Sequence, residues 1–130
     1  MSLVLDTNIL FELERDDKGV ISAVAELKAK HPGRICITSL NYCEVYHGAL
    51  DRGERSRRET LDYLDSFGLL NTTRGSAIRL AELRKSQKAK GAEVPVMDLL
   101  IASIVIDRGM TLVTRDKHFE GVEGLKVVVV

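Results

Sequence analysis

Four acidic residues stand where carboxylates could act together: Asp6, Glu44, Asp98 and Asp116. Two of them follow short runs, residues 3–5 and 111–114, that are typical of buried strands. Open α/β sheets place their ligands at the carboxyl ends of strands, so Asp6 and Asp116 are expected at one edge. Two carboxylates about 4 Å apart repel by roughly 4 kcal/mol at the effective dielectric of a protein surface. A cluster of four would therefore hold a proton or bind a cation.

The donor atoms of this cluster indicate which cation it would take. Oxygen ligands with little histidine favour Mg²⁺ or Mn²⁺ over zinc, and the sequence has only three His residues. A hard cation held by carboxylates can activate water, orient a phosphodiester and stabilise the leaving oxygen. The pattern predicts a metal-assisted nuclease with Mg²⁺ (or Mn²⁺) as cofactor and the four acids at its site.

Each acid also has a purely structural interpretation. Asp6, followed by Thr7 and Asn8, can cap a helix. Asp98 interrupts an apolar stretch after Pro95, near a helix N-terminus where backbone N–H groups favour negative charge, and Asp116 can be an ordinary turn aspartate. Independent caps nevertheless explain poorly why four acids attach to successive strand and helix units.

Two helical stripes compete to set the direction of Glu44. An inward stripe of Leu40, Cys43, His47 and Leu50 would place Glu44 at the border of the core, whereas one of Tyr42, Val45, Tyr46 and Ala49 would turn it outward. Periodicity alone does not choose between them.

The elements that would position these acids alternate along the chain. Strands are expected at Ser2–Leu5, Arg34–Thr38, Leu69–Thr72, Thr111–Thr114 and Lys126–Val130, and helices at Val20–Lys30, Ser39–Asp51, Glu54–Phe67, Gly75–Lys90 and Val96–Arg108. Runs without alternation suit strands covered on both faces. We expect an α/β domain with a mostly parallel central sheet flanked by helices.

The composition is that of one ordinary soluble domain, with 130 residues, 45% hydrophobic and 29% charged. The longest nearly apolar run, Leu99–Ile106, is far shorter than the roughly 20 residues of a membrane span. With no basic leader at the N-terminus, we expect a cytoplasmic protein without a membrane partner. Because 19 basic residues balance 19 acidic ones, a polyanion would have to be held locally.

Four segments resemble motifs of the PIN domain, and within it of the small prokaryotic VapC-type toxins. They are Leu3-Val4-Leu5-Asp6-Thr7-Asn8, Asn41-Tyr42-Cys43-Glu44, Asp98-Leu99-Leu100-Ile101-Ala102 and Thr114-Arg115-Asp116-Lys117-His118-Phe119. The resemblance covers almost the whole chain and agrees in order and spacing. One departure is Pro95, which stands where many relatives have a more flexible approach to the third motif.

The resemblance implies that residues 1–130 form a single PIN domain with a Rossmann-like fold and metal-dependent endoribonuclease activity. It implies Asp6, Glu44, Asp98 and Asp116 as the acidic cluster, with Asp6 and Asp98 as the foremost metal ligands. Thr7, Asn8 and Thr114 would be supporting polar groups. It also implies a homodimer and a cognate antitoxin protein that inserts a C-terminal segment toward the acidic groove.

Basic residues offer contacts to an RNA substrate. The candidates are Arg55, Arg57 and Arg58 in one segment, Arg84, Lys85 and Lys88 in a second, and Arg115 and Lys117 beside the fourth motif. Solvated helix faces with i,i+4 pairs, such as Arg55 with Glu59, explain the first two segments equally well.

Two alternatives belong to other functional classes. A receiver-like phosphoacceptor domain is also doubly wound and near this size. Receiver domains, however, have an acidic pair after the first strand, whereas this chain has only Asp6 there. A non-catalytic interaction module would keep the PIN fold and bind a partner without cleaving RNA.

Overall fold

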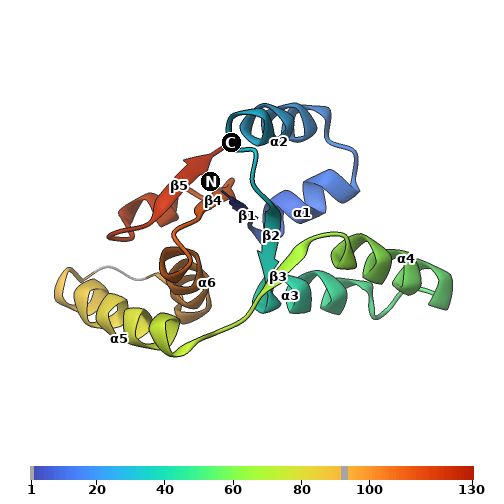
Figure 1. Cartoon of the computed structure of the whole chain (residues 1–130). Helices are drawn as coiled ribbons and strands as arrows, with labels where there is room; N and C mark the ends of the chain where they lie inside the picture. Colours follow the sequence, from blue (N-terminus) through green and yellow to red (C-terminus); the bar gives the residue numbers. More distant parts are fainter. Residues whose placement is uncertain (1, 92–93) are drawn as a thin grey trace.

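Five short parallel strands form one sheet in the computed structural model, which describes residues 2–91 and 94–130 (Figure 1). The strands are β1 (Leu3–Leu5), β2 (Ile35–Thr38), β3 (Gly68–Leu70), β4 (Thr111–Thr114) and β5 (Lys126–Val129), in the order β3-β2-β1-β4-β5. All four strand pairs are parallel. The expected α/β class with a parallel central sheet is confirmed.

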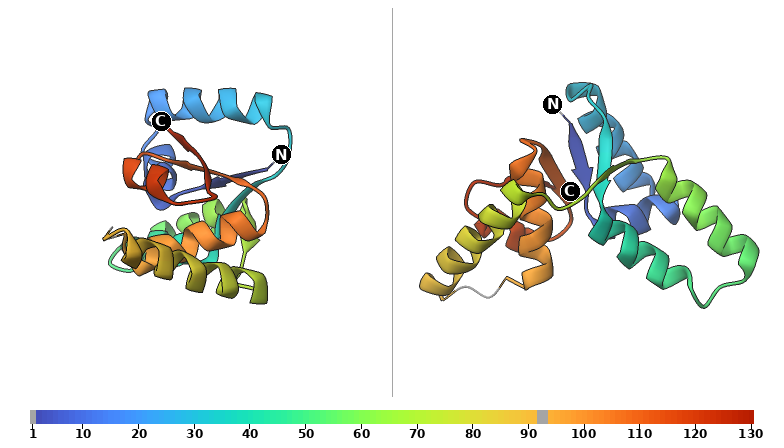
Figure 2. Two further views of the ribbon diagram at one scale, coloured as in Figure 1. Left: turned by 90° about the vertical axis from the view of Figure 1, so that its left-hand side faces the viewer. Right: turned by 60° about the horizontal axis from the view of Figure 1, so that its bottom comes forward.

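Helices flank this sheet on both faces. They are α1 (Thr7–Glu14), α2 (Lys18–Lys30), α3 (Ser39–Ala49), α4 (Glu54–Asp65), α5 (Arg74–Ala89) and α6 (Val96–Asp107), with a 3-10 helix η1 (Lys117–Gly121) before β5. The left view of Figure 2 shows α2 on one side of the strands and α5 and α6 on the other. No helix in the described part of the chain is long and apolar enough to cross a membrane.

Successive side chains of β1 pack into two separate hydrophobic clusters. Val4 packs with buried residues of α5 and α6, whereas Leu3 and Leu5 pack with buried residues of α1, α2, α3 and α4. This alternation is what a strand covered on both faces requires. Burial of Leu99 and Ile101–Val105 makes α6 the central helix that its apolar sequence predicts.

Several predicted segment ends differ from the structure by one or two residues, and η1 was not predicted. Two further differences concern α1 and β3. Helix α1 was not among the predicted segments, because its eight residues give too short a pattern to separate from the strand before it. The strand expected at Leu69–Thr72 instead occupies Gly68–Leu70, and Thr73 then caps α5. A Cβ on Gly68 would lie 2.9 Å from Cys36 Sγ, so the absence of a side chain lets β3 approach β2.

Candidate active site

Asp6 lies at the carboxyl end of β1, between the ends of β2 and β4. Its side chain is buried and accepts hydrogen bonds from the Thr7 backbone N–H (2.9 Å), Thr114 Oγ1 (2.7 Å) and Asn8 Nδ2 (3.3 Å). Asp6 is therefore the N-cap of α1 and also stands at the sheet edge, so its capping and its predicted place in the site are compatible.

Two further carboxylates act on Asp6 at this edge. Burial raises the pKa of Asp6, and the negative charges of Asp98 and Asp116 raise it further, while the hydrogen bonds from Thr114 and Thr7 oppose the rise. Asp98 comes from the first turn of α6, and Asp116 follows β4 as the N-cap of η1. The structure thus brings together three of the four predicted acids from separate elements.

His118 lies between two of these acids. Its Nε2 is 2.9 Å from Asp98 Oδ2 and its Nδ1 is 2.6 Å from Asp116 Oδ1, while the ring stacks on Phe119. Sequence reasoning did not single out His118, although it lies in the fourth motif. Its position two residues after Asp116, in a turn capped by that residue, was the available signal.

Glu44 joins the site through Thr7. The Thr7 hydroxyl donates to Glu44 Oε1 (2.9 Å) and accepts from Asn41 Nδ2 (3.1 Å). Asn41, Val45 and Ala49 are the buried residues of α3, so the stripe that turns Glu44 outward is the one the structure contains. Asn41 is a positioning residue that sequence reasoning missed. The available signal was its place three residues after Thr38, the spacing of a capping box at the start of a helix.

Two of the predicted supporting residues, Asn8 and Thr114, join the first turn of α1 to the end of β4 and the loop after it. Asn8 Oδ1 accepts from the Arg115 backbone N–H (3.2 Å), and Asn8 Nδ2 lies 3.4 Å from Thr114 Oγ1. Thr114 Oγ1 also accepts from the Asp116 backbone N–H (3.1 Å). Thr114 thereby contacts both Asp6 and Asp116, which fixes the separation of two acids.

The chemistry of the donor set fits a hard cation. Carboxylate oxygens from three elements face one edge, and an imidazole occupies the position between Asp98 and Asp116 where positive charge is favoured. Residues 2–91 and 94–130 nevertheless contain no preassembled group of three or more His, Cys, Asp or Glu side chains in position to ligate a metal. A cation would have to compete with His118 for the Asp98 and Asp116 oxygens.

The predicted basic residues fall into three different settings. On α4, Arg55 pairs with Glu59 (3.3 Å) and Arg58 with Glu54 (3.5 Å), as expected of a solvated helix face. Arg115 Nη1 lies 3.6 Å from Glu12 Oε2 and 3.9 Å from Asp17 Oδ2, so its side chain is engaged by acids near α1 and α2. Lys117, Arg57, Arg84, Lys85 and Lys88 make no ion pair with any described residue.

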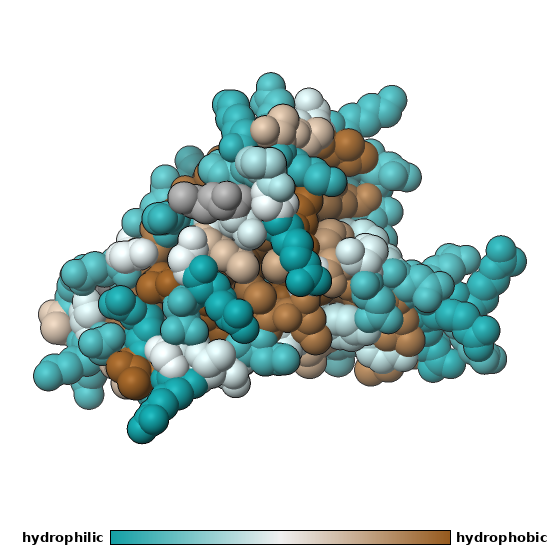
Figure 3. Space-filling view, in the orientation of Figure 1, coloured by the Kyte–Doolittle hydropathy of each residue, from teal (hydrophilic) through white to brown (hydrophobic). Residues whose placement is uncertain are grey.

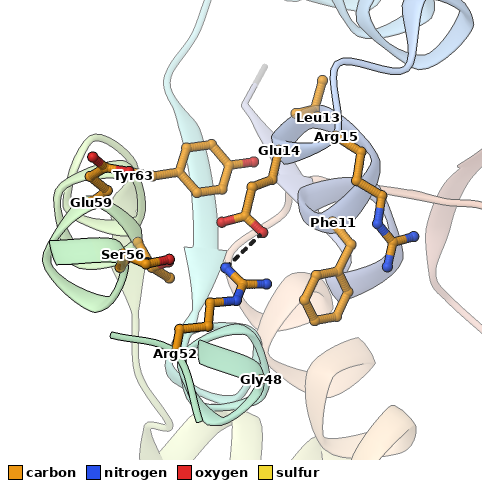
Figure 4. Close-up of a pocket in the computed structure, with 10 residues that line it drawn as sticks. Phe11, Leu13, Glu14, Arg15, Gly48, Arg52, Ser56, Glu59 and Tyr63 are labelled. Atoms are coloured by element: carbon orange, nitrogen blue, oxygen red, sulfur yellow. Dashed lines mark hydrogen bonds and ion pairs between the residues drawn. The ribbon is translucent and has the colours of Figure 1, made fainter. Parts of the chain in front are cut away.

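A separate cavity of about 760 Å³ opens between α1 and the α3–α4 hairpin (Figure 4). Glu14 and Arg52 face each other across it at 3.8 Å, and Phe11 and Tyr63 line its walls. The Tyr63 hydroxyl donates to the Leu10 carbonyl (2.8 Å), which fastens α4 to α1. None of the four predicted acids lines this cavity.

Known proteins are similar to this chain in sequence and in fold. The PIN domain family matches residues 3–125. "Ribonuclease VapC3" of Methanocaldococcus jannaschii is 31% identical over 80% of this chain and 98% of its own length, and the "tRNA(fMet)-specific endonuclease VapC" of Shigella flexneri is 27% identical over 97% and 96%. A crystal structure of VapBC2 from Rickettsia felis bound to a promoter DNA fragment contains a similar chain, with a TM-score of 0.85 and 27% sequence identity. The match covers 100% of this chain and 99% of that chain. The chain therefore belongs to the PIN domain family and, within it, to the VapC ribonucleases.

Proposed function

We propose that this VapC ribonuclease is the toxin of a VapBC-type toxin–antitoxin pair and cuts RNA internally at the cluster of Asp6, Glu44, Asp98 and Asp116, with Mg²⁺ (or Mn²⁺). One observation carries the assignment: Thr114 contacts both Asp6 and Asp116, and His118 contacts both Asp116 and Asp98, so a continuous set of contacts joins three acids from different parts of the chain. Such a cation, when bound, activates water and stabilises the leaving oxygen of the phosphodiester.

The side chains of this site have separable tasks. Asp6 is oriented by three donors and Asp98 contacts His118. We propose these two carboxylates as the foremost ligands, as the resemblance to the PIN domain implies. Asp116 is held at a fixed separation from Asp6 through Thr114. Glu44 is exposed and held by the Thr7 hydroxyl, so its free oxygen can accept a proton or orient a water molecule.

A circular RNA tests this assignment, because a molecule without ends can be opened only by internal cleavage. We expect the purified chain to open it in Mg²⁺ or Mn²⁺, to lose activity in chelator, and to regain it when Mg²⁺ is restored. Asp6→Asn and Asp98→Asn should be inactive but folded. Asp62→Asn, on an exposed position of α4, is the matched control and should keep full activity.

Two outcomes would contradict the assignment. Equal cleavage by the wild type and both site variants would indicate a contaminating nuclease or a different site. A folded wild type that binds a partner protein but never cleaves RNA would indicate the non-catalytic interaction module. The receiver-like interpretation has lost its basis, because the PIN domain match spans residues 3–125.

We further propose an antitoxin as partner, and a homodimer as the assembled form. The similar chain of known structure belongs to a VapBC2 assembly on promoter DNA, which supports a partner protein here. Co-expression with the protein encoded by an adjacent short reading frame, followed by measurement of the mass of the complex and of the isolated chain, tests both proposals. Since the proposed substrate is cellular RNA, we place this activity in the cytoplasm.

A further inference from the structure

A second cavity, of about 470 Å³, lies between α5 and α6. It is lined by Arg84, Lys85, Gln87 and Lys88 of α5 and by Val94, Val96 and Leu99. Asp98 does not line the cavity, but η1 contacts both regions, because the Gly121 carbonyl accepts from Gln87 and His118 contacts Asp98. One short helix therefore connects the cavity to the carboxylate cluster. We refer to it below as the α5–α6 pocket.

Three basic side chains at this pocket have no acidic partner among residues 2–91 and 94–130. Arg84, Lys85 and Lys88 are exposed and make no ion pair with any residue in the described ranges, whereas their neighbours Arg79 and Lys90 lie 3.8 Å from Glu82 and Glu123. Hydrophilic side chains project over both α5 and α4 in Figure 3, but on α4 they include Arg–Glu pairs. The α5–α6 pocket is therefore the better site for a polyanion.

Gln87 supplies an independent observation that points to a ligand. Its side chain is buried, with 4% of the residue exposed, and its Nε2 donates to the Gly121 carbonyl (3.4 Å). Its Oε1 is the buried side-chain atom left without a hydrogen-bond partner among the described residues. A buried acceptor without a donor is unfavourable. Because this oxygen has almost no accessible surface, the Gln87 side chain must turn toward the pocket before a ligand hydroxyl or N–H group can donate to it.

RNA has both the negative charge and the hydrogen-bond donor that would complement this pocket. Its phosphates complement the three cations, and its ribose 2′-OH is a donor that DNA does not have. Apolar contacts from Val94, Val96 and Leu99 suit the faces of the ribose or base. Building on the proposed function, we propose that the α5–α6 pocket binds the RNA strand next to the cleaved bond, with Arg84, Lys85 and Lys88 on phosphates and Gln87 Oε1 accepting from a 2′-OH.

Binding measured in chelator tests this site without cleavage. The probes are a single-stranded RNA and its 2′-deoxy counterpart of the same sequence, each titrated at several salt concentrations. Replacing Arg84, Lys85 and Lys88 together by Gln should weaken RNA binding by about tenfold or more and lower the salt slope by roughly 2 units. The matched control replaces Arg55, Arg57 and Arg58 by Gln on α4 and should change both values little.

Gln87→Met separates ribose recognition from charge. Methionine keeps the length of the side chain but removes the amide, so RNA binding should fall severalfold while binding of the 2′-deoxy strand stays unchanged. Thermal melting of each variant establishes that it is folded. Equal loss for both strands, or no loss for either, would overturn the role of Gln87.

Further outcomes would overturn the pocket, and they differ from those that overturn the nuclease assignment. The pocket is wrong if the α5 triple variant binds RNA like the wild type, or if the α4 triple variant loses as much. In Mg²⁺ the α5 variant should raise KM more than it lowers kcat. Cleavage that depends on Asp6 and Asp98 but ignores the α5 charges would overturn only the pocket, whereas pocket-dependent binding without cleavage would overturn only the nuclease assignment.

Discussion

The Thr114 hydroxyl donates a hydrogen bond of 2.7 Å to Asp6 Oδ2, which joins the carboxyl ends of the neighbouring strands β4 and β1 across 108 positions of sequence. The same oxygen accepts from the Asp116 backbone N–H at 3.1 Å. A single side chain thus holds two acids of the site in register. Burial raises the pKa of Asp6, and the hydrogen bond from Thr114 is the largest of the effects that lower it.

Replacing Thr114 by Val should move the pH dependence of cleavage. Without the hydrogen bond, the pKa of Asp6 rises further, so the ionised form needed at the site appears only at higher pH. The acid limb of the pH–rate profile should shift upward. Thr60→Val is the matched control, because it removes a buried hydroxyl that donates to Ser56 within α4, far from the acids in sequence. A Thr114→Val profile that superimposes on the wild-type profile would contradict this role.

Asp6→Asn should change how stability depends on pH when no metal is bound. Because the folded-state pKa of Asp6 is raised above its usual value of 3.8, its contribution to stability is fully present below that value and is lost as pH rises through the folded-state pKa. The melting temperature of Asp6→Asn minus that of the wild type should therefore increase with pH and then level off. Melting in chelator from about pH 4 to about pH 8 checks this. A difference that decreases with pH would mean that the fold favours the ionised carboxylate.

Asp98→Asn should separate metal binding from folding. Removing one of the clustered charges relieves repulsion, and Asn can still accept from His118, so the melting temperature in chelator should stay unchanged or rise. Mg²⁺ should raise the melting temperature of the wild type more than that of the variant, since a ligand stabilises the state that binds it. Asp62→Asn serves again as the control. An equal Mg²⁺ shift in both proteins, or an Asp98→Asn melting temperature far below wild type in chelator, would make Asp98 a structural residue.

Asn41→Ala should destabilise the fold although Asn41 contacts no predicted ligand directly. It removes the buried acceptor of the Thr38 backbone N–H (2.9 Å) and hydroxyl (2.7 Å), and the donor to Thr7. We expect a loss of about 1–3 kcal/mol in the free energy of unfolding. Asn71→Ala, in the exposed segment before α5, should stay within about 0.5 kcal/mol of wild type. Urea denaturation compares the two; similar values for both variants would show that the cap contributes little.

The place of Asp6 and Asp116 at one edge of the sheet could be predicted from the sequence, because short buried runs identify the strands and the acids follow them directly or after one residue. A short buried run followed by an acid places that acid at a carboxyl end, and parallel pairing then brings the ends of β1 and β4 together. The pair of Arg55 with Glu59 was also predictable, since helical spacing alone makes them neighbours.

Contacts set by tertiary packing could not be predicted in this way. The bridge of His118 between Asp98 and Asp116 depends on how η1 turns back toward α6. The engagement of Arg115 by Glu12 and Asp17 depends on the break between α1 and α2, where Asp16 adopts a positive φ of 58°. The direction of Glu44 required the position of α3 on the sheet, which decides between two stripes of similar hydrophobicity.

The most direct test of the central claim is the single-turnover rate of RNA cleavage by Asp98→Asn in saturating Mg²⁺, beside wild type and Asp62→Asn purified in the same way. The site assigned here predicts a loss of at least roughly 100-fold in Asp98→Asn, with RNA binding in chelator retained and Asp62→Asn equal to wild type. A cleavage rate for folded Asp98→Asn within about twofold of wild type would contradict the assignment of the carboxylate cluster as the active site.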